Sequence, residues 1–179
     1  MNRKWLIALA LLSASANALD LKGVRLGMTP EELKSAFPGG AAAGRPNENG
    51  VICYNAADFC AVNVGTIAEI PTQLQVSFLN GKVSDAYSGH LHPSQLDQIV
   101  DALKAKYGPP TATSMTKVQN GIGNTFDNPH FVWKFPEGEL RVSRFLAGPT
   151  SLDYAELRIV STAWIADEAA KRQKRNADL

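Results

Sequence analysis

The sequence predicts an α+β fold in which helices pack on one face of an antiparallel sheet and a further helix ends the chain. Helical patterns near residue 30 and from about 94 to 107 alternate with groups of strand-like segments. The connections between these strands are short enough for hairpins, which excludes a doubly wound parallel sheet. The order also allows two α/β half-repeats, about 19–90 and 91–162, in one domain, followed by a C-terminal helix and basic tail at 163–179.

The first helix is predicted by its entry signals. Thr29 is placed as the N-cap, and Pro30 follows at the first helical position. Glu32 completes a capping box, while Met28 and Leu33 flank the cap as a hydrophobic staple. The segment therefore docks a short helix on the sheet and carries no chemistry of its own.

Local patterns also predict the elements that follow. Residues 73–79 alternate between apolar and polar side chains, and Asn80-Gly81 behind them is the strongest hairpin signal in the chain. A second helix is predicted from about Ser94 to Tyr107, because apolar residues recur there at helical spacing. Residues 120–128 are polar and glycine-rich and are predicted to form a mobile loop.

Residues 1–18 have the pattern of a secretory signal peptide. Arg3 and Lys4 precede an apolar run from Trp5 to Leu12, and Ala16-Asn17-Ala18 fits a small-x-small cleavage site. The run is too short to span a bilayer, and no later stretch approaches about 18 apolar residues. We therefore expect a periplasmic or secreted protein, cleaved near Ala18 and without an integral membrane span. The alternative is an uncleaved N-terminal anchor.

Cys53 and Cys60 are the two cysteines of the chain. In an exported protein we expect them to form a disulfide bond across a short hairpin or tight loop. A redox pair would need C-x-x-C spacing, and two cysteines are too few for a structural zinc site. The disulfide is therefore interpreted as a structural staple.

Composition and motifs exclude several classes of function. A formal net charge of +1 implies no strongly acidic or basic partner. The chain also lacks the alternation of basic and aromatic residues that would indicate nucleic-acid binding. We find no phosphate-binding loop, dinucleotide fingerprint or G-x-S-x-G elbow, so no cofactor is expected and no catalytic residue is assigned. Asp97 and Asp101 lie four residues apart on the polar face of the second helix and are interpreted as solvated.

Histidines form one candidate binding site. His90 and His92 would point to the same side of an extended segment, where they could share a metal ion or a small ligand. His130 could supply a third ligand. The alternative is a pair of loop histidines that lead into the second helix.

Aromatic and basic residues form two further candidates. Phe131, Trp133 and Phe135 share one face of a predicted strand, and they could form an exposed platform for a partner or bury that face against a helix. The basic residues at 171–175 could contact anionic lipid, or they could form a solvated helix end.

Two motifs and the cysteines between them resemble a bacterial pattern. The motifs are Gly23-x-x-x-Gly27-Met28-Thr29-x-Glu31-Glu32 and Leu103-x-x-Lys106-Tyr107-Gly108-x-Pro110. Over about residues 22–110 the chain resembles small envelope modules related to the assembly lipoprotein BamE (SmpA) and to the β-lactamase inhibitory protein. The resemblance implies a helix pair on a small antiparallel sheet, an envelope compartment and a protein-binding role. The chain departs from it by lacking a lipidated cysteine after the signal and by a longer, strand-containing connection between helices.

Three functions are compatible with these observations. The first is a non-enzymatic periplasmic or secreted protein-binding or envelope-assembly module, whose partner would be an envelope protein. The second is a secreted inhibitor of a hydrolase, which would plug a cleft with a loop such as Asn120–Pro129. The third is a metal- or ligand-binding protein that uses His90 and His92. An open strand edge on either half would also permit dimerisation by β-pairing.

Overall fold

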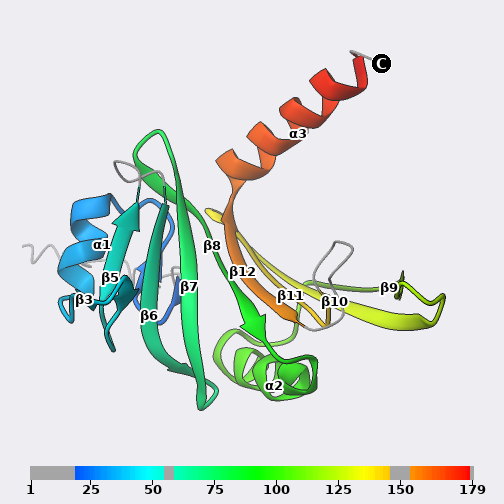
Figure 1. Ribbon diagram of the computed structural model, residues 1–179. Helices are drawn as coiled ribbons and strands as arrows, with labels where there is room; N and C mark the ends of the chain where they lie inside the picture. Colours follow the sequence, from blue (N-terminus) through cyan, green and yellow to red (C-terminus); the bar gives the residue numbers. More distant parts are fainter. Residues whose placement is uncertain (1–18, 55–58, 146–153, 178–179) are drawn as a thin grey trace, which may run out of the picture.

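The computed structural model describes residues 19–54, 59–145 and 154–177, and it is organised around one eight-stranded antiparallel sheet (Figure 1). Strands contain 51% of the described residues and helices 26%. The protein is therefore mostly β, and the predicted class of helices packed on one face of a sheet, with α/β half-repeats, is wrong. The main reason is that the strands extend through segments whose composition indicated loops.

The sheet consists of two four-stranded meanders, each in chain order, which join through their last strands. Every strand pair in it is antiparallel. In order across the sheet the strands are β5 (Val51–Tyr54), β6 (Phe59–Ile67), β7 (Ile70–Leu79), β8 (Lys82–Leu91), β12 (Ala155–Ser161), β11 (Gly138–Ser143), β10 (Thr125–Phe135) and β9 (Ala112–Gln119). The edge strands are therefore β5 and β9, the first strand of each meander.

Helix α1 (Pro30–Ala36) begins at the predicted capping box. The Thr29 N–H donates to Glu32 Oε2 at 2.7 Å, and the Glu32 N–H donates to Thr29 Oγ1 at 3.1 Å. The bond from the Thr29 backbone lowers the pKa of Glu32, because it stabilises the carboxylate. Leu33 is the buried residue of this short helix, so α1 is held by its cap and one anchoring side chain.

Helix α2 (Leu96–Tyr107) follows a 3₁₀ turn at Pro93–Gln95 and buries the predicted apolar stripe. Its end is fixed by two aromatic contacts with β10. The Trp133 indole Nε1 donates to the Gly108 carbonyl at 2.8 Å, and the Tyr107 ring meets Phe135 edge-on with centroids 5.3 Å apart. The predicted second helix is therefore confirmed, and it seals the core beside the second meander.

Helix α3 (Thr162–Ala177) continues directly from β12 and projects away from the sheet (Figure 1). Its first turns are half-buried, whereas residues 169–176 are exposed. Lys171 Nζ lies 2.7 Å from Asp167 and 3.3 Å from Glu168, so part of the basic end is already neutralised by its own helix. Across the described residues, none of the helices has the length and apolar character needed to cross a bilayer.

The N-terminal segment is built into the core through two short hairpin strands, β1 (Asp20–Leu21) and β2 (Val24–Arg25). It then runs beside the start of β8, where Gly27 N donates to Val83 O and Val83 N donates to Met28 O. A second small hairpin, β3 (Ala41–Ala42) with β4 (Arg45–Pro46), lies next to β5.

The predicted disulfide bond between Cys53 and Cys60 is present. The two residues lie directly opposite each other in the β5–β6 pair. The bond therefore ties the short edge strand β5 to the body of the sheet.

We predict that the double variant Cys53→Ala/Cys60→Ala folds but is less stable by roughly 2–3 kcal/mol, because the lost cross-link no longer restricts the unfolded chain. Urea unfolding measures the change. As a control, a reducing agent should shift the unfolding midpoint of the parent protein and leave that of the variant unchanged. Equal stability of the two oxidised proteins would contradict the prediction.

Candidate functional site

The predicted histidine site is not assembled from the side chains that the structure describes. His92 Nδ1 lies 2.8 Å from Ser94 Oγ and accepts the Ser94 N–H, so this imidazole caps the turn before α2. His130 Nε2 lies 2.8 Å from Thr116 Oγ1 on the β9–β10 hairpin. His90 is in β8, but its side chain lies outside the described part. Within that part, no group of three His, Cys, Asp or Glu residues could hold a metal ion.

The predicted aromatic platform lies largely in the core. Trp133 is 2% exposed, and Phe131 and Phe135 are half-buried against the core cluster. With its indole N–H bound to Gly108, Trp133 presents no surface to a partner. These rings explain how β10 packs beneath α2.

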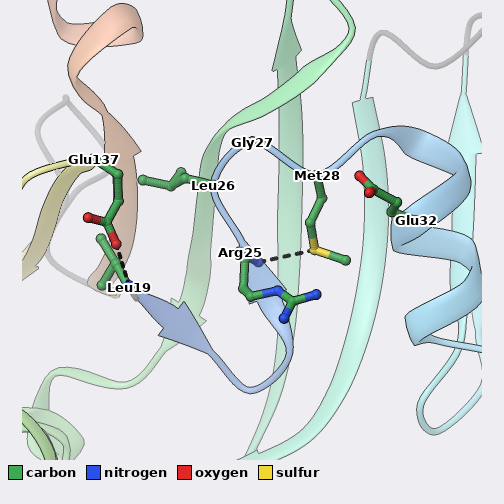
Figure 2. Close-up of a pocket in the computed structure, with 7 residues that line it drawn as sticks. All are labelled: Leu19, Arg25, Leu26, Gly27, Met28, Glu32 and Glu137. Atoms are coloured by element: carbon green, nitrogen blue, oxygen red, sulfur yellow. Dashed lines mark hydrogen bonds between the residues drawn. The ribbon is translucent and has the colours of Figure 1, made fainter. Parts of the chain in front are cut away.

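A hollow of about 250 Å³ opens beside the N-terminal segment (Figure 2). Its lining comprises Leu19, Arg25, Leu26, Gly27, Met28, Glu32 and Glu137. Both carboxylates already accept a backbone N–H: Glu32 from Thr29, and Glu137 from Leu19 at 2.6 Å. A general base must face a substrate proton, whereas these two groups hold the chain itself. Their geometry is that of structural anchors.

An ion pair between buried Asp85 and half-buried Arg158 spans β8 and β12. Arg158 Nε donates to Asp85 Oδ1 at 2.5 Å, and Glu156 lies 3.6 Å from another nitrogen of the same guanidinium. Asp85 is 3% exposed and is the one ionisable side chain in the buried class among the described residues. Burial raises the pKa of Asp85, and the Arg158 guanidinium opposes that rise.

This pair was not predicted, although the sequence carries one signal of it. Asp85 lies in the segment that returns after the Asn80-Gly81 hairpin signal, and aspartate is rare inside strands unless it has a partner. The partner, Arg158, is 73 residues away in the sequence. The sequence therefore indicates that Asp85 needs a partner but does not show which residue it is. The carboxylate is held by the guanidinium, which makes the pair a link between the two meanders.

The β9–β10 hairpin carries three of the four large apolar side chains that are exposed among the described residues, the fourth being Tyr154. Met115 on β9 is 59% exposed, Ile122 at the turn 85%, and Phe126 on β10 39%. From Ala112 to Lys117 every residue of β9 is exposed. The register places Met115 and Phe126 on opposite faces of the hairpin, and the Phe126 ring meets Phe145 edge-on with centroids 6.2 Å apart.

The register of the hairpin shows which backbone groups of β9 are open. Met115 lies opposite Pro129, and proline has no N–H to donate. This position must therefore be a non-hydrogen-bonded pair, so the N–H and C=O of Met115 point away from β10. Hydrogen-bonded and non-hydrogen-bonded pairs alternate along antiparallel strands. The N–H and C=O groups of Thr113, Lys117 and Gln119 therefore also point away from β10.

The β9 edge lacks the usual protection of edge strands. Such strands are commonly short, or carry proline, charge or a bulge. The pairing of β9 with β10 runs over eight residue pairs without a shift in register. The charge of Lys117 is neutralised by Asp127 on β10, 2.6 Å away. By contrast, the other edge strand, β5, has four residues and is tied by the disulfide.

The hairpin turn is held by the side chain of Asn120. Its Oδ1 accepts the N–H groups of Ile122 (3.2 Å) and Asn124 (2.8 Å), and the Gln119 amide donates to Gly123 O at 2.9 Å. The mobile loop predicted at 120–128 is therefore a tight turn followed by the start of β10. It presents Ile122 at its tip.

Comparisons with protein-family models, with curated proteins and with solved structures find no match. The resemblance to BamE-related and β-lactamase-inhibitory modules therefore stays a prediction. The candidate site rests on the residues of this chain alone, and the β9–β10 hairpin is the feature that they favour.

We predict that Arg158→Met destabilises the protein by about 2–4 kcal/mol at about pH 7, because it leaves the Asp85 carboxylate buried without its cation. The loss should shrink as the pH falls toward about 4. Without the opposing guanidinium, burial raises the Asp85 pKa further, so the group takes up a proton and becomes neutral. Urea unfolding at both pH values measures this.

Lys117→Met is the matched control, because it breaks an exposed ion pair on the same sheet. It should cost less than about 1 kcal/mol. Equal effects of the two substitutions would contradict the dependence of the buried Asp85 carboxylate on Arg158.

Proposed function

We propose that this chain is a non-enzymatic protein-binding module that acts in the periplasm or outside the cell, and that it binds its partner by strand addition at β9. The observation that carries the proposal is the open edge of β9. It offers outward backbone groups at four alternate residues, beside the exposed side chain of Met115.

Strand addition suits this edge for a physical reason. An extended peptide gains affinity from main-chain hydrogen bonds and specificity from the side chains between them. The outward N–H and C=O groups of Thr113, Met115, Lys117 and Gln119 can bond such a peptide without disturbing the bonds of β9 to β10. The partner is therefore a protein that supplies an extended segment.

Two observations of different kinds support the proposed compartment. The Cys53–Cys60 disulfide is typical of an oxidising environment. Residues 1–18 have the pattern of an export signal. Together they favour an envelope protein as the partner.

We predict that the mature protein captures a protein partner from envelope extract, and that Met115→Pro weakens the capture about tenfold or more. Proline at 115 removes an N–H that points to the open edge and leaves the bonds between β9 and β10 in place. Cross-linking followed by mass spectrometry identifies the partner, and titration of that purified partner gives the ratio of affinities.

Met115→Ala is the matched control, because it keeps the backbone N–H and shortens only the side chain. It should bind more tightly than Met115→Pro, and both variants should unfold near the parent midpoint. Capture that is unaffected by proline would contradict binding at this edge. The absence of any reproducible partner would count against the function itself.

A secreted inhibitor of a hydrolase is the second candidate, and Ile122 favours it. This side chain is 85% exposed at the tip of a turn that Asn120 holds rigidly from within. Such a tip could enter a cleft with little loss of conformational entropy.

For this candidate we predict inhibition of at least one enzyme in a panel of lysozymes, proteases and β-lactamases. Ile122→Asp should abolish the inhibition, because it would place a charge in an apolar contact. Met115→Pro should leave it intact, which separates this function from strand addition. Unchanged activity across the whole panel would eliminate the candidate.

A further inference from the structure

The folded domain includes its N-terminal segment from Leu19 onward (Figure 2). The side chain of Leu19 is 1% exposed, and Leu21 is also buried. Between them, the Asp20 carbonyl accepts hydrogen bonds from the Tyr107 hydroxyl at 2.5 Å and from Lys106 Nζ at 2.9 Å. A cut on the C-terminal side of Leu19 would therefore remove part of the core.

The backbone nitrogen of Leu19 has a carboxylate as its partner. It lies 2.6 Å from Glu137 Oε1, across 118 residues of sequence. Glu137 is in the turn between β10 and β11, and its carbonyl accepts the N–H of Thr162 at the start of α3. At the next residue, Gly138, a Cβ would collide with the Val160 carbonyl oxygen. The Glu137 carboxylate is thus fixed at a tightly packed junction.

We propose that an export peptidase cuts the bond between Ala18 and Leu19, and that the new Leu19 α-ammonium group forms an ion pair with Glu137. Ala16-Asn17-Ala18 supplies the small residues that such a peptidase selects. The cut consumes one water molecule. Ala18 leaves with a carboxylate, and Leu19 keeps its nitrogen as an ammonium group.

Cleavage changes the chemistry of this contact while keeping its position. In the uncut chain the Leu19 nitrogen is an amide with one N–H and no charge. In the cut chain it is a cation with three N–H groups, so the hydrogen bond to the Glu137 carboxylate gains the attraction between opposite charges. Glu137 therefore favours the processed chain, so export and folding are coupled at a junction that is separate from β9.

The test compares two chains, one that starts at Leu19 and one that starts at Ala18, each with Glu137 and with Glu137→Gln. Both are released from a cleavable fusion that leaves no extra residue. We expect the folding equilibrium constant of the Leu19 chain to exceed that of the Ala18 chain by about fivefold, a gain that Glu137→Gln removes. Equal stability of the two starts would overturn the proposal, as would a difference that persists when both chains carry Glu137→Gln.

A second measurement needs no substitution. The full sequence is expressed in a bacterial host, and the intact mass of the exported protein gives its N-terminus. We expect a single species that covers residues 19–179 with one disulfide bond. Any other N-terminus would overturn the proposed cleavage site.

Discussion

The pairing of β8 with β12 joins the two meanders into one sheet, and the rest of the described architecture depends on it (Figure 1). The two faces of this seam differ in chemistry. Ala86 and Ile159 lie opposite each other on the core side, whereas Asp85 and Arg158 form their ion pair on the other face. A slip of one residue in this pairing would turn the charged side chain of one strand toward the core and separate Asp85 from Arg158, so the pairing of β8 with β12 has one acceptable register.

The seam also decides which strands become edges. Because each meander contributes its last strand to the centre, the first strands, β5 and β9, lie at the outside. The two edge strands differ in how well they are protected from pairing with another strand. It shortens β5 and ties it by a disulfide, but it leaves β9 eight residues long with Met115 exposed. An unprotected edge is a liability unless a partner covers it, and this asymmetry leads to the proposed binding function.

Features that depend on neighbouring residues were predictable from the sequence. The Thr29 cap, the apolar stripe of α2 and the Asn80-Gly81 turn all formed as expected, as did the disulfide. The fold class was not, because strands extend into segments whose composition indicated loops and because the β6–β7 turn lacks the usual signals. Ala68 and Glu69 form that turn with φ of 49° and 64°, values that favour glycine or asparagine. The outward direction of the Met115 backbone depends on Pro129, which lies opposite it on β10. The ion pair of Asp85 depends on Arg158, which lies in the other meander. Neither relation is visible along the chain.

Residue-resolved hydrogen exchange on the free mature protein tests most directly whether β9 is the open edge of a sheet joined at β8 and β12. We expect the amides of Thr113, Met115, Lys117 and Gln119 to exchange quickly, while those of Ser114, Thr116 and Val118 exchange slowly. Amides in the β8–β12 seam should be among the slowest. Uniform protection along β9, or rapid exchange in the seam, would contradict the open edge and the joined sheet, respectively.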